Sequence, residues 1–298
     1  MTGIHQNLKE KFSRSLFHII SALAAEMNQD TYVIGGYVRD LLLHRPSKDL
    51  DIMTVGDGIA LAEKVAAALK LRTEVTVFKN FGTAMFRYRN LEVEFVGARK
   101  ESYSSDSRKP LVESGTLDDD QKRRDFTINA LAVSLNEHNF GELLDPFEGM
   151  EDLERKIIRT PCDPDITFSD DPLRMMRGIR FAAQLGFSVY DETLVAIARN
   201  KERIRIISAE RVAEELNKII LSPKPSVGFI LLEETGLLEI VFPELARMKG
   251  VEAVRGNAHK DNFYHTLKVL DQLVPYSDNL WLRWSALEWS LRLRWWVV

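Results

Sequence analysis

The chain has 298 residues, of which 45% are hydrophobic and 28% charged, and its formal net charge is −4. This composition is that of a soluble globular protein with room for two or three domains, and no apolar run is long enough to span a membrane. We expect no membrane partner, and the lack of a signal-peptide pattern and the single cysteine, Cys162, point to the reducing cytoplasm. One cysteine also excludes an internal disulfide and a cysteine-based zinc site. The net charge gives no global basic field, so nucleic acid would have to bind local basic clusters.

The first predicted elements are an amphipathic helix over residues 8–28 and a buried strand over residues 32–34. Gly35 and Gly36 then allow a tight turn, and residues 37–43 predict a short helix. Bare N–H groups at such a turn, next to the positive end of a helix, suit a phosphate chain. Two glycines after a strand are common in α/β proteins, so this signal is weak by itself.

A second strand is predicted around Asp49 and Asp51. Because side chains alternate along a strand, both carboxylates project from one face. Two like charges this close are costly unless a cation lies between them, and such oxygen ligands suit Mg²⁺ bound together with substrate phosphates. A D-x-D pair is often only a solvated strand end, but its position just after the glycine turn favours the functional interpretation.

A helix is predicted over residues 57–70, with Asp57 as its cap. Strands are predicted over residues 73–77, 83–88 and 91–97. Together these elements indicate a mixed sheet with flanking helices, in an α/β or α+β domain. On the last strand Glu92 and Glu94 face the same way, and spacing leaves two interpretations open: a further carboxylate at a metal site, or a solvated strand face.

Residues 100–118 are polar and predict a mobile loop, in which Arg108-Lys109 could touch a polyanion. A solvated face explains the acidic run 118–120. It does not easily explain Arg123-Arg124, which directly precede an apolar segment that enters the core. Arginine forks bind phosphate oxygens bidentately, so this pair suits a phosphate ligand.

After Pro161 strands give way to helices, which predicts a domain boundary near that residue. The next helix is expected to be capped by Asp170 or Asp171, with Pro172 in its first turn. Further helices are predicted over residues 191–200, 208–221 and 225–235, the last of them ended by Gly236.

Arg174, Arg177 and Arg180 recur every three residues along the helix that follows Pro172. This stripe has two open interpretations, a solvated face with ion pairs or a set of ligand contacts. Asp171 and Arg174 are neighbours on a helix surface, so an acceptor and a donor side by side could read the edge of a base.

In their order and spacing these motifs resemble the class II tRNA nucleotidyltransferases and bacterial poly(A) polymerases, from about residue 30 to residue 271. The resemblance rests on Gly35-Gly36 with Arg39-Asp40, Asp49 with Asp51, residues 123–130 (RRDFTINA), residues 170–174 (DDPLR) and Glu210-Arg211. The RRDFTINA segment is highly specific.

The resemblance implies an α+β fold. A head with the nucleotidyltransferase fold of polymerase β, a mixed sheet with helices, would be followed by an all-α neck and a truncated helical domain. The implied domains are a catalytic head over residues 1–160, a base-recognising neck over 161–222, and a helical body with an incomplete HD-like start over 223–298.

The resemblance also implies that Asp49 and Asp51 hold catalytic Mg²⁺ ions, and that Glu94 has a supporting role. The reaction implied is in-line attack of an RNA 3′-hydroxyl on the α-phosphate of a nucleotide, with release of pyrophosphate. Catalysis would consist mostly of positioning and charge neutralisation, without a covalent intermediate.

The nucleotide-binding residues implied by the resemblance are Gly35, Gly36, Arg39, Arg124, Asp125, Asn129, Asp171, Arg174, Arg177 and Arg180. Among them Arg124 matches a position that binds the triphosphate. Asp171 and Arg174 match the pair that hydrogen-bonds the Watson–Crick edge of CTP or ATP.

Two features depart from the family pattern. Residues 257–271 resemble the start of an HD-type domain, but no histidine follows His265, so the later His-Asp pair of such a metal site is missing. His259 and His265 are therefore expected to be remnants or surface residues. All 5 tryptophans lie within residues 281–296, and this Arg/Trp-rich end suggests a truncated or frame-shifted C-terminus.

We therefore expect an enzyme that adds CCA, or part of it, to tRNA 3′ ends from CTP and ATP. A poly(A) polymerase of the same family is the main alternative, disfavoured by the HD-like start, and a CC-only or A-only enzyme is a further possibility. A non-catalytic RNA-binding protein is disfavoured by the intact Asp and Arg motifs, and an HD phosphohydrolase by the missing His-Asp pair. The oligomeric state stays open.

Overall fold

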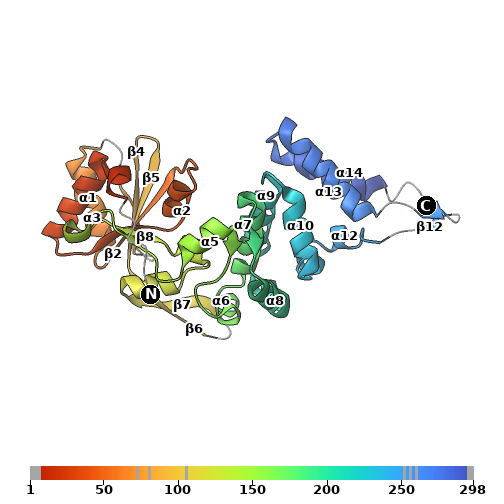
Figure 1. The fold of residues 1–298 in the computed structure, drawn as a ribbon, viewed down its shortest axis with the longest axis horizontal. Coiled ribbons are helices and arrows are strands. Elements are labelled where there is room, and N and C mark those ends of the chain that lie inside the picture. The colour runs from red at the N-terminus through yellow and green to blue at the C-terminus, as the bar shows by residue number, and fades with distance from the viewer. Residues whose placement is uncertain are drawn as a thin grey trace. The chain divides into compact units, whose positions relative to one another are not determined.

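The computed structural model describes residues 8–71, 74–79, 82–104, 107–250, 253–254, 257–258 and 261–293. The chain divides into two units, Met1–Arg155 and Lys156–Val298, and each is described by itself (Figure 1).

A seven-stranded sheet forms the centre of the first unit, in the order β3-β4-β5-β2-β1-β8-β9. Its strands are β1 (Thr31–Ile34), β2 (Asp49–Thr54), β3 (Thr76–Phe78), β4 (Thr83–Tyr88), β5 (Leu91–Gly97), β8 (Ala132–Ser134) and β9 (Leu143–Leu144). The pair β2/β5 is parallel, and the other neighbouring pairs of this sheet are antiparallel. The prediction of a mixed sheet with flanking helices is confirmed.

Helices cover this sheet because their apolar stripes match its apolar faces (Figure 1). The helices of the unit are η1 (Lys9–Phe12), α1 (Ser15–Glu26), α2 (Gly36–Leu42), α3 (Gly58–Ala68), α4 (Leu117–Lys122), η3 (Thr127–Asn129), η4 (Glu137–Asn139) and α5 (Gly149–Arg155). The helix α3 packs on β4, β5 and α1, and Asp57 caps it as predicted, since its Oδ1 accepts a bond from the Ala60 N–H (3.0 Å). The helix predicted over residues 8–28 begins only at Ser15, because Arg14 has extended backbone angles.

The prediction of a loop over residues 100–118 is wrong. Two antiparallel strands, β6 (Arg99–Ser104) and β7 (Ser107–Ser114), form a separate ladder there, and α4 follows. A strand pair is held by backbone hydrogen bonds, which polar residues satisfy as well as apolar ones. The polar composition therefore hid the ladder.

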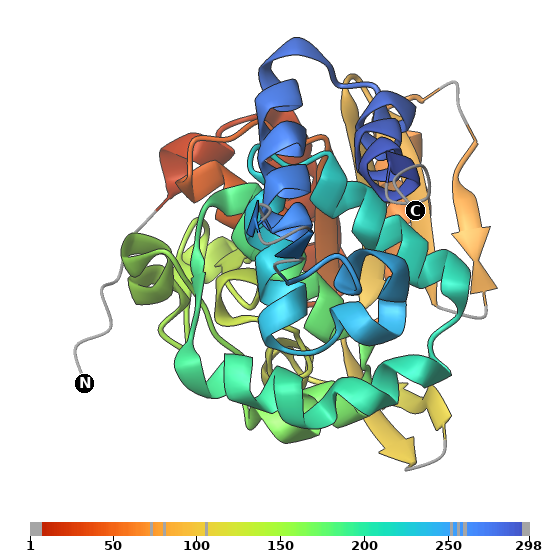
Figure 2. The same ribbon diagram turned by 90° about the vertical axis from the view of Figure 1, so that its right-hand side faces the viewer.

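The second unit is mostly helical. Its helices are α6 (Pro164–Asp170), α7 (Leu173–Leu185), α8 (Asp191–Asn200), η5 (Lys201–Ile206), α9 (Ala209–Ile220), α10 (Pro225–Glu234), α11 (Leu238–Val241), α12 (Pro243–Ala246), α13 (Asn262–Leu273), η6 (Val274–Tyr276) and α14 (Leu280–Leu293). Two short ladders join them, β10 (Ile157–Ile158) with β11 (Ser188–Val189) and β12 (Ala253–Val254) with β13 (Asn257–Ala258). Within the unit α7 packs against α9 and α10, and α10 against α13 (Figure 2).

The three helices predicted after residue 190 are confirmed as α8, α9 and α10. Gly236 follows α10 with φ +72° and donates its N–H to the Glu233 carbonyl (2.9 Å). This is the left-handed conformation in which glycine commonly follows a helix.

The last described helix, α14, is anchored by Arg283, which is only 2% exposed to solvent. The Arg283 guanidinium donates to the carbonyls of Ile220 (2.8 Å) and Ser277 (2.8 Å). Trp284 adds a hydrogen bond from Nε1 to Asn217 Oδ1 (2.7 Å). The expectation of a truncated or frame-shifted end stays a prediction, because residues 294–298 lie outside the described residues.

Along the described residues, no helix is both long and apolar enough to cross a membrane. His265 is exposed on α13, as expected for a surface residue, whereas His259 lies outside the described residues.

Candidate functional site

The strand register of the first unit brings Asp51 and Glu94, two of the predicted acidic site residues, together. Asp51 on β2 lies opposite Glu94 on the parallel strand β5 and opposite Ile34 on the antiparallel strand β1. Leu50 and Ile52 are fully buried on the other face, so Asp49 and Asp51 project from the same face. Since Ile34 directly precedes the glycine turn, one register places that turn beside Asp51.

This face carries negative charge that its neighbouring arginines offset only in part. Burial raises the pKa of Asp51, and the carboxylates of Asp49 and Asp120 raise it further, while Arg124 opposes them. Partial burial and the neighbouring Asp51 also raise the pKa of Glu94, against the pull of Arg99. Ionising these groups together is therefore unfavourable without an added positive charge, and hard oxygen donors in this setting fit a divalent cation.

The two glutamates of β5 differ, which spacing could not decide. In the β2/β5 register Glu92 lies opposite Asp49, and Glu94 lies opposite Asp51. Of the two, only Glu92 forms an ion pair within the described residues, with Arg87 on β4 (Nε to Oε1, 3.0 Å). No group of three or more His, Cys, Asp or Glu side chains within the described ranges is gathered closely enough to hold a metal by itself. A cation held here by Asp49 and Asp51 would need further oxygens, as Mg²⁺ commonly takes from phosphates and water.

Gly35 forms the turn between β1 and α2 in the left-handed region, with φ +74°. A Cβ on Gly35 would lie 2.7 Å from Arg124 Nη1 and 3.4 Å from Asp51 Oδ2. A side chain is therefore disfavoured by the backbone angle, and the Arg124 guanidinium would have to shift to admit it. At Gly36 the nearest atom to an added Cβ is Arg39 Nη2 at 3.6 Å, an ordinary contact.

Three predicted residues form one hydrogen-bonded chain. Arg39 is buried and donates from Nη1 to Asn129 Oδ1 (2.7 Å), and Asn129 Nδ2 donates to Asp125 Oδ1 (2.9 Å). The other side of the Arg39 fork meets Asp40 at 3.0 and 2.9 Å. The charge of Arg39 is thus satisfied next to the glycine turn.

The sequence interpretation missed Asp120. A solvated face was expected for the acidic run, and this is correct for Asp118, which pairs with Lys122 at the surface. Asp120 instead is fully buried and accepts bonds from Arg123 and Arg124. The spacings i,i+3 and i,i+4 to the two arginines are the signal that could have indicated this contact.

The remaining predicted residues belong to the second unit. Asp171 follows α6, and its Oδ1 accepts a bond from the Leu173 N–H (3.1 Å) at the start of α7. Its carbonyl accepts the Arg174 N–H (3.0 Å), and Arg174 is buried with Nη1 3.5 Å from the Thr167 carbonyl. The acceptor Asp171 and the donor Arg174 are therefore adjacent, at the turn between two helices.

Arg180 and Arg177 lie further along α7. Arg180 Nε is 2.8 Å from Glu215 Oε2 on α9, and its guanidinium stacks 4.1 Å from the centre of the Phe181 ring. Arg177 lies 5.6 Å from the same ring. A fully solvated stripe is thus wrong for Arg174 and Arg180. Sequence spacing also missed Glu215, which is 2% exposed, as the partner of Arg180.

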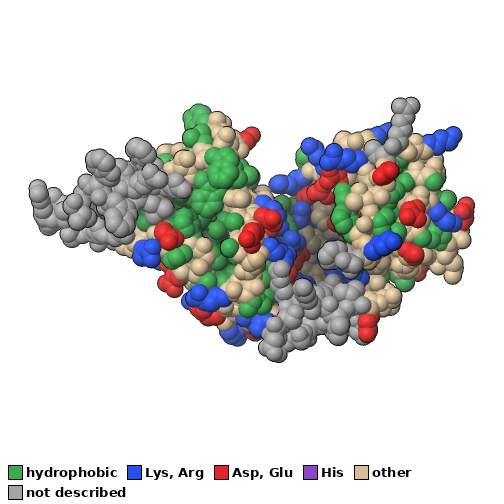
Figure 3. All heavy atoms as spheres, turned by 180° about the vertical axis from the view of Figure 1, so that it is seen from behind, with side chains coloured by type: hydrophobic (Ala, Val, Ile, Leu, Met, Phe, Trp, Pro, Cys, Tyr) green, Lys and Arg blue, Asp and Glu red, His purple; other side chains and the backbone are tan. Residues whose placement is uncertain are grey.

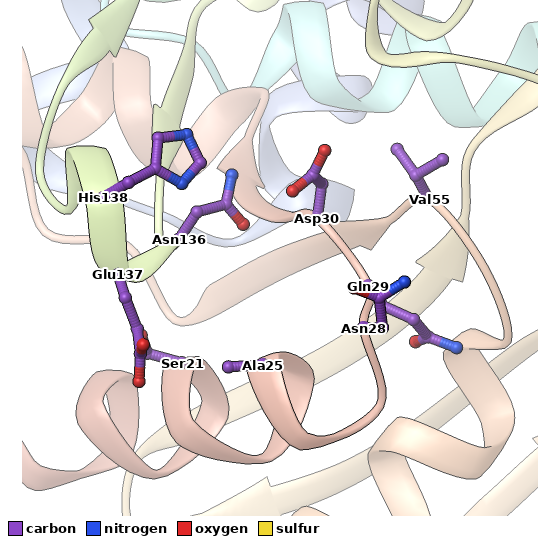
Figure 4. A pocket seen from close by; sticks show the side chains of 9 residues that line it. All are labelled: Ser21, Ala25, Asn28, Gln29, Asp30, Val55, Asn136, Glu137 and His138. Atoms are coloured by element: carbon purple, nitrogen blue, oxygen red, sulfur yellow. The ribbon is translucent and has the colours of Figure 1, made fainter.

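A polar pocket lies at the opposite end of β1 from the glycine turn (Figure 4). It is lined by residues such as Gln29, Asp30, Asn136 and His138. None of the predicted site residues lines it, so the chemistry that the motifs indicate lies elsewhere. On the faces drawn in Figure 3, acidic and basic side chains are interspersed, which matches the small net charge.

Comparison with known proteins matches the chain in two segments. Residues 31–159 match the family model described as the poly A polymerase head domain, and residues 186–249 match the one described as a probable RNA and SrmB-binding site of polymerase A. The first segment contains the glycine turn, the carboxylate face and the RRDFTINA segment.

Curated relatives and solved structures agree with these matches. The chain is 40% identical over 244 residues to a CCA-adding enzyme of Anoxybacillus flavithermus, covering 81% of this chain and 58% of that protein. It is 34% identical over 270 residues to an A-adding tRNA nucleotidyltransferase of Geobacter sulfurreducens, covering 89% of this chain and 28% of that protein. A crystal structure of a tRNA nucleotidyltransferase complexed with a primer tRNA and an incoming ATP analogue matches with TM-score 0.71 and 27% identity, covering 90% of this chain and 74% of that one.

The chain therefore spans little more than half the length of the first of these relatives, and less of the second. Its mixed sheet with helices is the head-domain fold of its structural neighbours. The chain therefore carries a poly A polymerase head domain followed by the RNA-binding segment of polymerase A, and over most of its length it is similar to CCA-adding enzymes and tRNA nucleotidyltransferases.

Proposed function

We propose that this chain adds C and A to the 3′ ends of tRNA, using CTP and ATP with Mg²⁺ and releasing pyrophosphate. The observation that carries the proposal is the face where Asp51 meets Glu94 beside the Gly35 turn and the Arg124 guanidinium. This arrangement puts carboxylate oxygens that could bind a cation next to N–H groups that could donate hydrogen bonds to a phosphate chain. The names of the relatives, CCA-adding enzyme and A-adding tRNA nucleotidyltransferase, supply the substrate class.

Asp49 and Asp51 are the residues that would hold Mg²⁺, with Glu94 in a supporting role. The raised pKa of Asp51 fits this assignment, since a cation would relieve the repulsion among the carboxylates. A bound Mg²⁺ would activate the attacking RNA hydroxyl and stabilise the leaving oxygen. The chain itself supplies the fixed carboxylates and orients them through the β2/β5 register.

The glycine turn and the arginines around it would bind the incoming nucleotide. Arg124, with Nη1 near Gly35, would contact the triphosphate, where a fork of N–H donors matches phosphate oxygens. Gly36 and Arg39 would contact the nucleotide beside it. Asn129 and Asp125 would act by holding Arg39 in place, as their hydrogen bonds suggest.

Asp171 and Arg174 would read the Watson–Crick edge of the base. Cytosine and adenine each offer an amino donor beside a ring-nitrogen acceptor, which one carboxylate and one guanidinium can satisfy in turn. A guanine or uracil edge would leave these groups unpaired, and unpaired buried polar groups are costly. Arg177 and Arg180 would add further nucleotide contacts, with Arg180 oriented by Glu215.

In this proposal the head covers residues 1–160, the neck 161–222 and the helical body 223–298. The partners are tRNA, CTP and ATP, and the enzyme works in the cytoplasm.

An A-only enzyme is the alternative that one relative names, with 34% identity against 40% for the CCA-adding relative. A poly(A) polymerase, a CC-only enzyme and a non-catalytic RNA-binding protein would each give a different product pattern on defined tRNA primers.

Nucleotide binding tests the proposal at its first step. CTP and ATP should bind in the presence of Mg²⁺, and GTP should bind much more weakly, as measured by calorimetry with the whole chain. Binding of none of the three would contradict the proposal, since an RNA-binding protein without a nucleotide site gives that result.

A further inference from the structure

We infer that Asp120 is a positioning residue that fixes the Arg124 guanidinium beside the Gly35 turn and thereby sets the affinity for the triphosphate of the incoming nucleotide. The inference rests on the proposed function. The Asp120 side chain forms ion pairs with Arg123 and Arg124, which both lie in the first unit.

Asp120 is the fully buried end of two arginine forks. Its Oδ2 accepts bonds from Arg124 Nε (3.1 Å) and Nη2 (3.0 Å), and its Oδ1 accepts from Arg123 Nε (3.0 Å) and Nη2. A carboxylate that receives two charge-assisted forks holds both guanidinium planes in one orientation. Burial alone would raise the pKa of Asp120. The two arginines more than offset that effect and lower the pKa, so the carboxylate stays ionised.

One side of the Arg124 guanidinium is turned away from Asp120. With Nε and Nη2 of Arg124 used by Asp120, Nη1 is left to face the site. Nη1 lies 2.7 Å from the position of a Cβ on Gly35 and donates to the Asn129 carbonyl across 3.3 Å. The orientation that Asp120 imposes is therefore the one that turns the remaining N–H donors toward the glycine turn.

No carboxylate other than Asp120 forms an ion pair with Arg124 in the described part of the chain. Arg124 has a long, flexible side chain, and a free one would lose considerable rotamer entropy on binding phosphate. Fixing it in advance removes much of that cost, which is the advantage of a preorganised site. Loss of Asp120 should therefore weaken binding of ligands that carry a triphosphate and spare ligands that do not.

The experiment compares CTP with CMP, each with Mg²⁺, by calorimetry on the whole chain. For Asp120→Asn we expect the CTP affinity to fall roughly tenfold or more, with the CMP affinity unchanged. The matched control is Asp118→Asn on the same helix, whose carboxylate pairs with Lys122 at the surface. This control should change neither affinity. A thermal melt of each variant shows whether it folds.

Two further variants test the inference if Asp120→Asn does not fold. Arg124→Lys keeps the positive charge and loses the fork, and we expect it to lose CTP affinity selectively. Lys122→Gln removes a positive charge from the surface of the same helix, where Lys122 pairs with Asp118, and the ratio of CTP to CMP affinity should hold. Where Asp120→Asn folds, adding it to Arg124→Lys should not change that ratio further, because both act through one interaction.

The outcomes separate the two claims. If the unmodified chain binds neither nucleotide, the proposed function fails. If it binds CTP but Asp120→Asn keeps the ratio of CTP to CMP affinity, or lowers both affinities alike, the inference about Asp120 is overturned while the proposed function stands. Equal ratios for Arg124→Lys and the unmodified chain would also overturn it.

Discussion

Asp51 and Glu94 lie directly opposite each other on the parallel strands β2 and β5, and the charge of Asp51 helps to raise the pKa of Glu94. A pair of like charges at a strand register position is not retained for stability. It is typical of a site where a ligand supplies the opposing charge, and proteins commonly accept a loss of stability there.

Asp51→Asn should stabilise the chain at neutral pH in the absence of Mg²⁺. Burial raises the pKa of Asp51, so the folded state binds more protons than the unfolded state at intermediate pH, and the contribution of this group to stability falls as pH rises. The melting temperature of Asp51→Asn should exceed that of the unmodified chain at pH 8. The gap should close below about pH 3.9, where the unfolded carboxyl is protonated as well.

The same variant should lose nucleotide addition by roughly a hundredfold or more, the size of effect seen when one electrostatic group of an active site is removed. A lower melting temperature than the unmodified chain at pH 8 would mean that Asp51 is a stabilising residue. Melts at both pH values, with and without Mg²⁺, provide the measurement.

Gly35→Ala should destabilise the chain, with Gly36→Ala as its matched control. Gly35 has φ +74° and ψ −139°, a combination that costs a residue with a side chain about 1–3 kcal/mol, and the new Cβ would lie 2.7 Å from Arg124 Nη1. At Gly36 the closest contact would be 3.6 Å. Urea unfolding of the two variants should therefore differ by at least about 1 kcal/mol. Equal midpoints for the two variants would contradict this account of the turn.

Arg283→Ala should destabilise the second unit. Arg283 is buried and donates to several backbone carbonyls, and a buried acceptor left unpaired costs about 1–3 kcal/mol. Arg247→Ala serves as control, because its pair with Glu244 is largely exposed and surface changes stay within about 0.5 kcal/mol. Unfolding followed by tryptophan fluorescence reports on this unit, since the tryptophans lie within residues 281–296. A stable Arg283→Ala variant would show that the packing of α14 does not depend on these bonds.

Asp171→Asn should relax base selection rather than abolish binding. The amide retains one acceptor and presents a donor in place of the other, so discrimination between CTP and UTP should drop by roughly tenfold. Arg199→Lys, at an exposed pair with Asp165, is the control. The kcat/KM ratio for the two nucleotides is the measurement, and unchanged discrimination would remove Asp171 from base reading.

Local spacing predicted the features that depend on neighbours in the chain. The Asp57 cap, the helices α8 to α10 and the glycine end of α10 follow from side chains within a few residues of each other. The mixed sheet was predictable because β1 is a short apolar run and β2 and β5 alternate apolar and polar residues over much of their length. The site residues of the first unit came from motifs, and the register explains why Asp49, Asp51 and Glu94 share a face.

Features set by distant contacts could not be predicted in the same way. The burial of Asp120 depends on the elements packed around α4, and Asp118, only two residues away, is exposed. The role of Glu215 depends on α9 packing against α7. The β6/β7 ladder depends on pairing between strands whose polar residues resemble a loop.

Primer extension tests the central claim most directly. The chain is incubated with Mg²⁺, CTP, ATP and labelled tRNAs that end before CCA, after C and after CC, with an unrelated RNA primer for comparison and the Asp49→Ala/Asp51→Ala double variant as control. The proposed function predicts stepwise completion of CCA on all three tRNAs, little extension of the unrelated RNA, and no product from the double variant. Long adenosine tails on any RNA, or no extension by a chain that still folds, would contradict it.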